Sequence, residues 1–192
     1  MNAEKTAEQI LKEDGALLEG HFELRSGMHS SRYLQCAKVF QHPAHSEAIA
    51  RRLSALIGRT RVEAVVGPAT GGIIAAYELA RVMGARALFA ERVEGVFALR
   101  RGFCIDPGER IVVAEDVITT GGAVSEVVEL VRGLGGDVIA VAAVVNRSGG
   151  NPFDVPFHYL YEFDAPAWTG EKCPLCREGV PLDKPGSRAE VK

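Results

Sequence analysis

The sequence predicts an α/β fold in which helices cover both faces of a mostly parallel sheet. Short apolar runs alternate with segments of helical periodicity along the 192 residues, which is typical of this fold class. The run at 137–145, DVIAVAAVV, is so continuously apolar that neighbouring elements should cover both of its faces. A parallel sheet between helices provides that covering.

Composition favours a single domain of a soluble, cytoplasmic protein. A chain of this length that is 47% hydrophobic can bury one sizeable core. The formal charge of -3 gives no reason to expect a nucleic-acid or membrane partner. There is no run of 18 apolar residues, and the N-terminal segment is polar and acidic, unlike a signal peptide. We divide the domain, residues 1–192, into an N-terminal helix and arm, an α/β core and a C-terminal tail (1–42, 43–165 and 166–192).

The N-terminal part predicts a helix and then a hairpin. Apolar residues suit an amphipathic helix over 3–19, broken or ended near Gly15 or Gly20 (Ile10, Leu11, Leu17 and Leu18). Residues 21–40 contain two short extended runs around a Ser/Gly turn, which indicates a hairpin or arm.

The next elements form the first strand-turn-helix unit. Residues 44–57 suit a helix ended by Gly58, and VEAVV at 62–66 suits a short buried strand. The following segment, GPATGG, is a glycine-rich loop that leads into a helix from Ile73 to about Met83.

The remaining core elements follow the same alternation. Residues 86–89, 111–114 and 137–145 are predicted strands. The helix after 111–114 has the clearest periodicity in the chain and should stop at Gly135 and Gly136 (Val124, Val127, Val128, Val131 and Leu134).

The segment VVAEDVITTGGA, residues 112–123, carries the chemistry. An apolar strand ends in Glu115 and Asp116 and passes through a Thr/Gly turn into a helix. Ligands bind outside the carboxyl ends of parallel strands, and free N–H groups at a helix N-terminus attract anions. The hydroxyls and glycines of this turn therefore predict a phosphate site. Neither a Walker loop nor a GxGxxG fingerprint is present.

The two carboxylates would repel a bound phosphate unless they face hydroxyl groups or a divalent cation. A ribose diol and Mg²⁺ both meet that need. The pair and the turn together predict a site for a ribose 5-phosphate group, and the simpler alternative is an ordinary turn with a solvated acid pair.

These residues resemble a known family. VVAEDVITTGGA is similar to the phosphoribosyl pyrophosphate (PRPP) motif of type I phosphoribosyltransferases. FELRSGMHSSRY at 22–33 and VVNRSGG at 144–150 resemble segments of the orotate phosphoribosyltransferases, and the closing CPLCREGVPLDKPGSR resembles the tail of one branch. The resemblance implies a Rossmann-like core with a small N-terminal hood and transfer of the phosphoribosyl group from PRPP to orotate, giving orotidine 5′-monophosphate and pyrophosphate.

The resemblance also implies roles for individual residues. It implies that Glu115 and Asp116 are catalytic residues and candidate partners of a Mg²⁺ ion that binds through PRPP. It places PRPP against the two acids, the two glycine turns and one basic residue of the arm (Arg25, Ala69, Thr70, Gly71, Gly72, Glu115, Asp116, Val117, Ile118, Thr119, Thr120, Gly121, Gly122 and Ala123). It places orotate against the arm and one arginine, whose guanidinium suits a carboxylate (Ser26, Gly27, Tyr33, Thr119 and Arg147). The simpler alternatives are a plain glycine-rich loop at GPATGG and a plain hairpin turn at Arg25–Gly27.

One segment departs from the family pattern. Many orotate enzymes carry lysines and a histidine in a mobile loop over the pyrophosphate, but the matching ERVEGVFALRRGF has arginines only. We expect Arg92, Arg100 and Arg101 to act catalytically in their place. The resemblance also implies a homodimer in which loop 92–103 reaches the neighbouring site, and the alternative is a solvated charged turn.

Two other functions stay open, and the cysteines and histidines predict no metal site. A purine phosphoribosyltransferase would keep the PRPP turn but would not need Arg147, and a PRPP-sensing regulator would need a basic face. Cys173 and Cys176 have zinc-knuckle spacing but lack a second pair, so we expect a reduced pair or a local turn, and the alternative is a partial site that a second subunit completes. The five histidines are expected to be surface or hydrogen-bonded residues.

Overall fold

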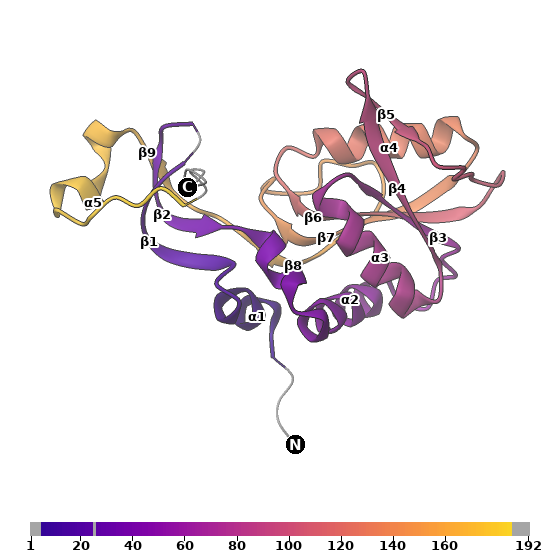
Figure 1. Cartoon of the computed structure of the whole chain (residues 1–192), viewed down its shortest axis with the longest axis horizontal. Helices are drawn as coiled ribbons and strands as arrows, with labels where there is room; N and C mark the ends of the chain where they lie inside the picture. The colour runs from indigo at the N-terminus through magenta and orange to yellow at the C-terminus, as the bar shows by residue number, and fades with distance from the viewer. Residues whose placement is uncertain (1–4, 25, 186–192) are drawn as a thin grey trace, which may run out of the picture.

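The computed structural model describes residues 5–24 and 26–185, which form a large and a small lobe (Figure 1). A six-stranded sheet lies at the centre of the large lobe, and a three-stranded sheet forms the small lobe. The large sheet is mostly parallel and is flanked by helices, which confirms the predicted fold class. No helix in the described part of the chain is long and apolar enough to cross a bilayer.

The large sheet has the strand order β5-β4-β3-β6-β7-β8. Neighbouring strands run parallel except in the hairpin of β4 and β5. The central position of β6 puts its carboxyl end between those of β3 and β7. The strand bounds are β3 (Ala64–Pro68), β4 (Arg86–Val93), β5 (Val96–Leu99), β6 (Arg110–Ile118), β7 (Asp137–Asn146) and β8 (Phe157–Glu162).

Helices cover both faces of this sheet because its strands are apolar on both sides. Val65 and Val112 pack with α2 (Pro43–Ile57) and α3 (Gly71–Met83) on one face. Val66 and Val113, their chain neighbours, pack with α4 (Gly122–Gly133) on the other. Complete burial of such a side chain contributes roughly 1.5 to 3 kcal/mol.

The first helix is shorter than the sequence predicts. Helix α1 (Ala7–Glu13) begins with a capping box between Thr6 and Gln9, and the chain turns at Gly15, where φ is 62°. Leu17 and Leu18 therefore belong to strand β1 (Leu17–Glu23), and their assignment to the helix was wrong. A periodic apolar pattern that crosses a glycine turn is ambiguous between a longer helix and a helix followed by a strand.

Two other boundaries differ from the prediction. Helix α3 begins at Gly71, two residues earlier than expected, so only Ala69 and Thr70 separate it from β3. Leu134 lies after the end of α4 and is 45% exposed, so its assignment to the periodic apolar positions of that helix was wrong.

The small lobe joins the two ends of the chain. Strands β1 and β2 (His29–Leu34) form the predicted hairpin, and β9 (Ala167–Trp168) pairs with β2. The segment after β9 contains η2 (Gly170–Lys172) and α5 (Pro174–Arg177), and then it runs back along β1, where Glu23 N–H donates to the Asp183 carbonyl at 2.8 Å. The arm and the tail are therefore one structural unit. Between the lobes, η1 (Cys36–Gln41) leads from β2 into α2.

Candidate active site

The acid pair lies near the carboxyl end of β6, where both side chains are half-buried. Asp116 N–H donates to Glu115 Oε1 at 3.0 Å, and Val117 N–H donates to Asp116 Oδ1 at 2.8 Å. The two carboxyl groups also interact with each other, so they form one acidic unit at the end of the strand. This is the position in a parallel sheet at which ligands bind.

Burial, together with the negative charge of Asp116, raises the pKa of Glu115 to about 9. No basic side chain of the described chain contributes to that pKa. The pair is therefore electrostatically unbalanced and favours a ligand that brings hydroxyl donors or positive charge.

The turn between β3 and α3 lies directly against these carboxylates. A Cβ atom on Gly71 would be 2.8 Å from Asp116 Oδ1, and one on Gly72 would be 3.0 Å from Glu115 Oε1. Only glycine allows so close an approach. The peptide bond between Ala69 and Thr70 in this turn is cis.

The second glycine turn encloses a small cavity of about 140 Å³ at the N-terminus of α4, lined by Glu115 and by 117–124. Gly121 has a φ of 82°, which aims the chain into the helix, and its carbonyl accepts from Ser125 N–H at 2.8 Å. The N–H groups of the first helical turn, together with two threonine hydroxyls, make this cavity suited to a phosphate, although Gly122 N–H already lies 3.5 Å from Thr120 Oγ1.

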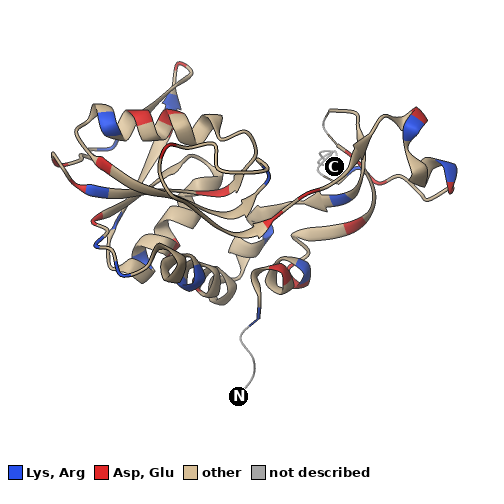
Figure 2. Cartoon of the chain, turned by 180° about the vertical axis from the view of Figure 1, so that it is seen from behind, with Lys and Arg blue, Asp and Glu red and all other residues tan. Residues whose placement is uncertain are grey.

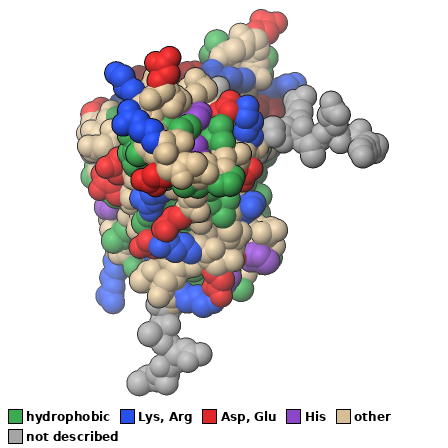
Figure 3. All heavy atoms as spheres, turned by 90° about the vertical axis from the view of Figure 1, so that its left-hand side faces the viewer, with side chains coloured by type: hydrophobic (Ala, Val, Ile, Leu, Met, Phe, Trp, Pro, Cys, Tyr) green, Lys and Arg blue, Asp and Glu red, His purple; other side chains and the backbone are tan. Residues whose placement is uncertain are grey.

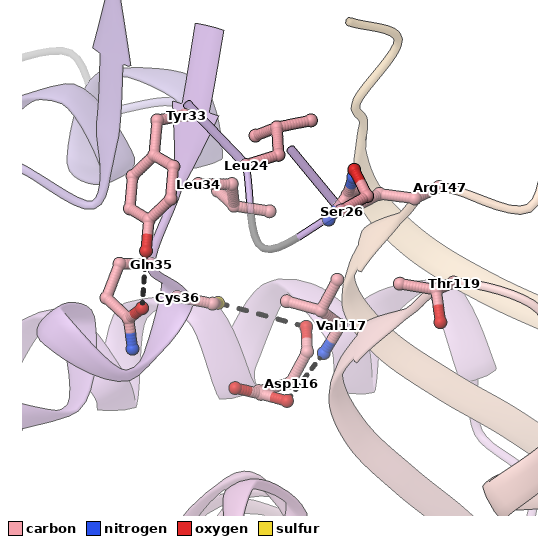
Figure 4. Close-up of a pocket in the computed structure, with 10 residues that line it drawn as sticks. All are labelled: Leu24, Ser26, Tyr33, Leu34, Gln35, Cys36, Asp116, Val117, Thr119 and Arg147. Atoms are coloured by element: carbon pink, nitrogen blue, oxygen red, sulfur yellow. Dashed lines mark hydrogen bonds between the residues drawn. The ribbon is translucent and has the colours of Figure 1, made fainter. Parts of the chain in front are cut away.

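A larger cavity of about 450 Å³ lies between the small lobe and the end of β6 (Figure 4). In the close-up, the arm residues Leu24, Tyr33 and Leu34 lie opposite Asp116 and Thr119. The lining residues are Leu24, Ser26, Tyr33, Leu34, Gln35, Cys36, Asp116, Val117, Thr119 and Arg147.

Arg147 is positioned by the end of β7. Its N–H donates to the Ile118 carbonyl at 2.7 Å, which ties it to the strand that carries the acid pair. The buried Asn146 accepts from Ser148 N–H at 2.9 Å and donates to the Gly150 carbonyl at 3.2 Å, so the following turn is fixed. The guanidinium lies 5.2 Å from the ring of Phe163 and lines the larger cavity.

Comparison with known proteins identifies this arrangement. A family model described as a phosphoribosyl transferase domain matches residues 36–155. The orotate phosphoribosyltransferase of Thermotoga maritima is 51% identical over 181 residues, which are 94% of this chain and 97% of that protein. This chain belongs to the orotate phosphoribosyltransferase family. The family predicted from the sequence motifs is therefore confirmed.

Two further members of the orotate phosphoribosyltransferase family support the assignment. The protein from Caldanaerobacter subterraneus subsp. tengcongensis is 53% identical over 189 residues, covering 98% of this chain and 99% of its own length. The crystal structure of orotate phosphoribosyltransferase from Aeropyrum pernix aligns with a TM-score of 0.69 and 26% identity, covering 82% of this chain and 93% of that one.

The structure brings most of the predicted orotate-side residues of this family together. Ser26, Tyr33, Thr119 and Arg147 line one cavity with Asp116. Gly27 is in the same arm turn, with a φ of 76°, but does not line that cavity. Arg25, predicted to contact PRPP, lies outside the described residues.

The predicted loop arginines lie away from this cavity. The loop is a short hairpin of β4 and β5 that projects from the core (Figure 1). Arg92 makes two bonds of 2.9 Å to Glu126 on α4, and its guanidinium carbon lies 4.1 Å from the centre of the Phe97 ring. Arg101 pairs with Glu91 at 3.0 Å, and Arg100 lies 3.7 Å from the same carboxylate.

Several lining residues of the cavity were not predicted. The Cys36 thiol is buried, lies 3.8 Å from the Asp116 carbonyl, and has a pKa raised well above its ordinary value by burial and then by the charge of Asp116. Leu24 and Leu34 supply an apolar wall. No chemical motif marks these residues, and only their positions beside the predicted arm residues could have suggested them.

Proposed function

We propose that this chain transfers the 5-phosphoribosyl group from PRPP to orotate, releasing pyrophosphate and forming orotidine 5′-monophosphate. The observation that carries the proposal is the single cavity lined by both Arg147 and Asp116. A base bound at the arginine would lie beside a ribose bound at the acid. The sequence identity of 51% to 53% to orotate phosphoribosyltransferases, over 94% to 98% of this chain, supports orotate as the base and not a purine. Acidic and basic residues are interspersed over both lobes, unlike the basic face of a nucleic-acid-binding regulator (Figure 2).

PRPP would occupy the two glycine turns and the acid pair between them. The 5′-phosphate fits the N-terminal turn of α4, where N–H groups converge. The ribose hydroxyls would donate to Glu115 and Asp116. The pyrophosphate would lie along Ala69–Gly72, whose glycines already lie against the acids.

Mg²⁺ fits the same place. Carboxylate oxygens are ligands that this ion prefers, and Glu115 and Asp116 offer two of these groups side by side. Among the described residues, no basic side chain contributes to the pKa of Glu115. When bound with PRPP, Mg²⁺ supplies positive charge that offsets charge on the pyrophosphate.

Orotate would bind with its carboxylate against the Arg147 guanidinium, which can donate two parallel hydrogen bonds. The hydroxyls of Ser26, Tyr33 and Thr119 lie around the same cavity. They would orient the ring so that N1 faces the anomeric carbon.

The reaction needs no protein nucleophile. The bond from the anomeric carbon to pyrophosphate breaks, the bond from that carbon to N1 forms, and positive charge develops on the ribosyl group between these events. N1 loses its proton, which the departing pyrophosphate or solvent accepts. The negative charge of Asp116 stabilises the positive charge on the ribosyl group through the ribose hydroxyls, and the wall of Leu24 and Leu34 limits access of water. Catalysis is therefore positioning combined with electrostatic stabilisation.

The test is turnover with PRPP, Mg²⁺ and either orotate or a purine base. We expect loss of orotate absorbance together with pyrophosphate release. Turnover of adenine, hypoxanthine or xanthine, with none of orotate, would contradict the proposal.

In the same assay, Arg147→Ala should raise the KM for orotate by roughly 10- to 100-fold, because a hydrogen bond to a charged group contributes about 1.5 to 3 kcal/mol. The KM for PRPP should change little. Arg132→Ala is the matched control, since Arg132 pairs with Glu129 and Asp154 outside the site. Equal effects of both variants on orotate would remove Arg147 from base recognition.

We also propose a homodimer in which Arg92, Arg100 and Arg101 act at the partner's pyrophosphate. This proposal is supported by the projecting hairpin and by α3, which exposes Ile74 at 46% and Tyr77 at 59%. Large exposed apolar side chains that lie close together mark association surfaces.

Complementation tests the shared site. A heterodimer of Arg92→Ala and Asp116→Asn subunits has one intact site, so it should regain about half of the wild-type activity expected for a two-fold symmetric dimer. Glu126→Gln is the control because it breaks the ion pair but keeps Arg92. If Glu126→Gln lowers activity as much as Arg92→Ala, and the heterodimer stays inactive, Arg92 has only a structural role.

A further inference from the structure

Four metal-ligating side chains converge in the small lobe, away from the site described above. His21 comes from β1, His29 from β2, and Cys173 and Cys176 from the tail that packs on them. One ligand atom of each lies within 4.8 Å of all the others. Figure 3 views this lobe end-on and shows histidine side chains between hydrophobic ones.

The expectation that the two cysteines lack a second ligand pair was therefore wrong. His21 and His29 supply that pair, from positions about 150 residues earlier in the sequence. The hairpin brings the two histidines together: Glu23, two residues after His21, is the cross-strand partner of His29, and the two imidazole rings lie 4.9 Å apart.

The spacing of the ligand atoms matches a tetrahedral ion. His21 Nε2 lies 3.0 Å from His29 Nδ1, 3.4 Å from Cys173 Sγ and 3.6 Å from Cys176 Sγ. Cys176 Sγ lies 3.2 Å from His29 Nδ1. Tetrahedral bonds of about 2.0 to 2.3 Å separate ligand atoms by roughly 3.3 to 3.8 Å, so these four distances lie within a few tenths of an ångström of the tetrahedral range. All four ligand atoms lie within 4.8 Å of one another, so an ion at the centre would require the group to contract.

A hydrogen bond prepares His21 to bind a metal. Its Nδ1 lies 2.8 Å from the Val180 carbonyl, which can only accept. The proton must therefore be on Nδ1, and this leaves the lone pair of Nε2 directed toward the two sulfur atoms. His21 and Cys173 are buried, with 3% and 0% of their surfaces exposed.

We propose that these four side chains bind one structural Zn²⁺ ion. Two thiolates and two imidazoles are a preferred zinc ligand set, and four protein ligands leave no open position for substrate. The small lobe has a use for such an ion. The hydrophobic clusters of the described chain include no residue from 18–33 or from 166–185, so apolar packing alone holds this lobe weakly.

The ion would also position part of the active site. His21 and His29 bracket the arm turn that contains Leu24 and Ser26, both of which line the larger cavity. A metal that joins both ends of this turn to the tail fixes the base side of the cavity. The inference about zinc itself depends only on the four ligands and stands independently of the proposed reaction.

The first test is metal analysis of the full-length protein purified without chelators. We expect about one Zn²⁺ per chain by mass spectrometry, retained through gel filtration. Replacement by Co²⁺ should give the visible absorption bands of a tetrahedral ion with thiolate ligands. Protein without zinc that also gives no such Co²⁺ spectrum would overturn the proposal, as would a disulfide between Cys173 and Cys176 in protein purified under reducing conditions.

Variants then assign the ligands. Cys176→Ser should lower bound zinc at least about fivefold, since one of four ligands is lost. Cys104→Ser, which removes an exposed free cysteine outside the cluster, should keep a full equivalent. Zinc retained in Cys176→Ser, or lost equally in Cys104→Ser, contradicts the assignment. The Co²⁺ spectrum of the unmodified protein keeps the test valid if Cys176→Ser folds poorly.

Discussion

An Asp116→Asn variant is expected to lose roughly 10- to 100-fold in kcat/KM for PRPP, because hydrogen bonds to a charged carboxylate contribute about 1.5 to 3 kcal/mol. The amide has the same shape, so the neighbouring Gly71 still fits against it. The change also removes the negative charge that helps to raise the pKa of Glu115. Steady-state kinetics at saturating orotate measures the effect.

The loss in kcat/KM for PRPP should be the same whichever base is the acceptor. This distinguishes the role of Asp116 from that of Arg147, whose replacement should affect orotate only. Asp154→Asn is a matched control, since Asp154 pairs with Arg132 outside the candidate site. Unchanged kinetics in Asp116→Asn would show that the acid pair does not contact the ribose.

A Gly67→Ala variant is expected to damage both stability and activity. The added Cβ would lie 2.2 Å from the Gly72 carbonyl oxygen and 2.6 Å from its carbon. These are backbone atoms, so the turn must move away from β3. We expect a loss of at least about 1 to 3 kcal/mol in the free energy of unfolding, the usual cost of overpacking. Urea denaturation measures this loss, and activity should fall further because the turn lies against Glu115 and Asp116.

Gly133→Ala is the control for that change. Gly133 is in α4, and apart from the adjoining backbone of its own helix no atom lies within 4 Å of the added Cβ, so alanine should be neutral or stabilise the helix by up to about 1 kcal/mol. Equal stability of the Gly67→Ala protein and the unmodified protein would show that this turn can shift without cost.

The sequence predicted the parts of the fold that are encoded locally. The strand, turn and helix of residues 110–133 follow one another without interruption, so periodicity and glycine placement were sufficient to predict them. Arg147 was predicted only through resemblance to a family, since its position depends on the pairing of β6 with β7.

Contacts between distant segments could not be predicted in this way. The approach of Gly71 and Gly72 to the acid pair depends on β3 lying next to β6. The local sequence of neither segment determines which strands are neighbours in the sheet. The His and Cys cluster depends on the tail returning to β1 and β2. The spacing of Cys173 and Cys176 marks only half of the ligand set, and nothing in the local sequence links it to the histidines at 21 and 29.

The return of the tail along β1 also orders events during synthesis. Strands β1 and β2 of the arm are made before the large lobe, whereas the third strand of the arm, β9, and its contacts at Asp183 follow the large lobe in the sequence. The six strands of the large sheet are complete at β8, and Phe163 of the adjoining apolar core follows directly, whereas the arm is completed only by β9 and Asp183. During synthesis the large lobe would therefore fold before the small lobe that covers the larger cavity is complete. The chain would gain orotate binding only when the small lobe has formed.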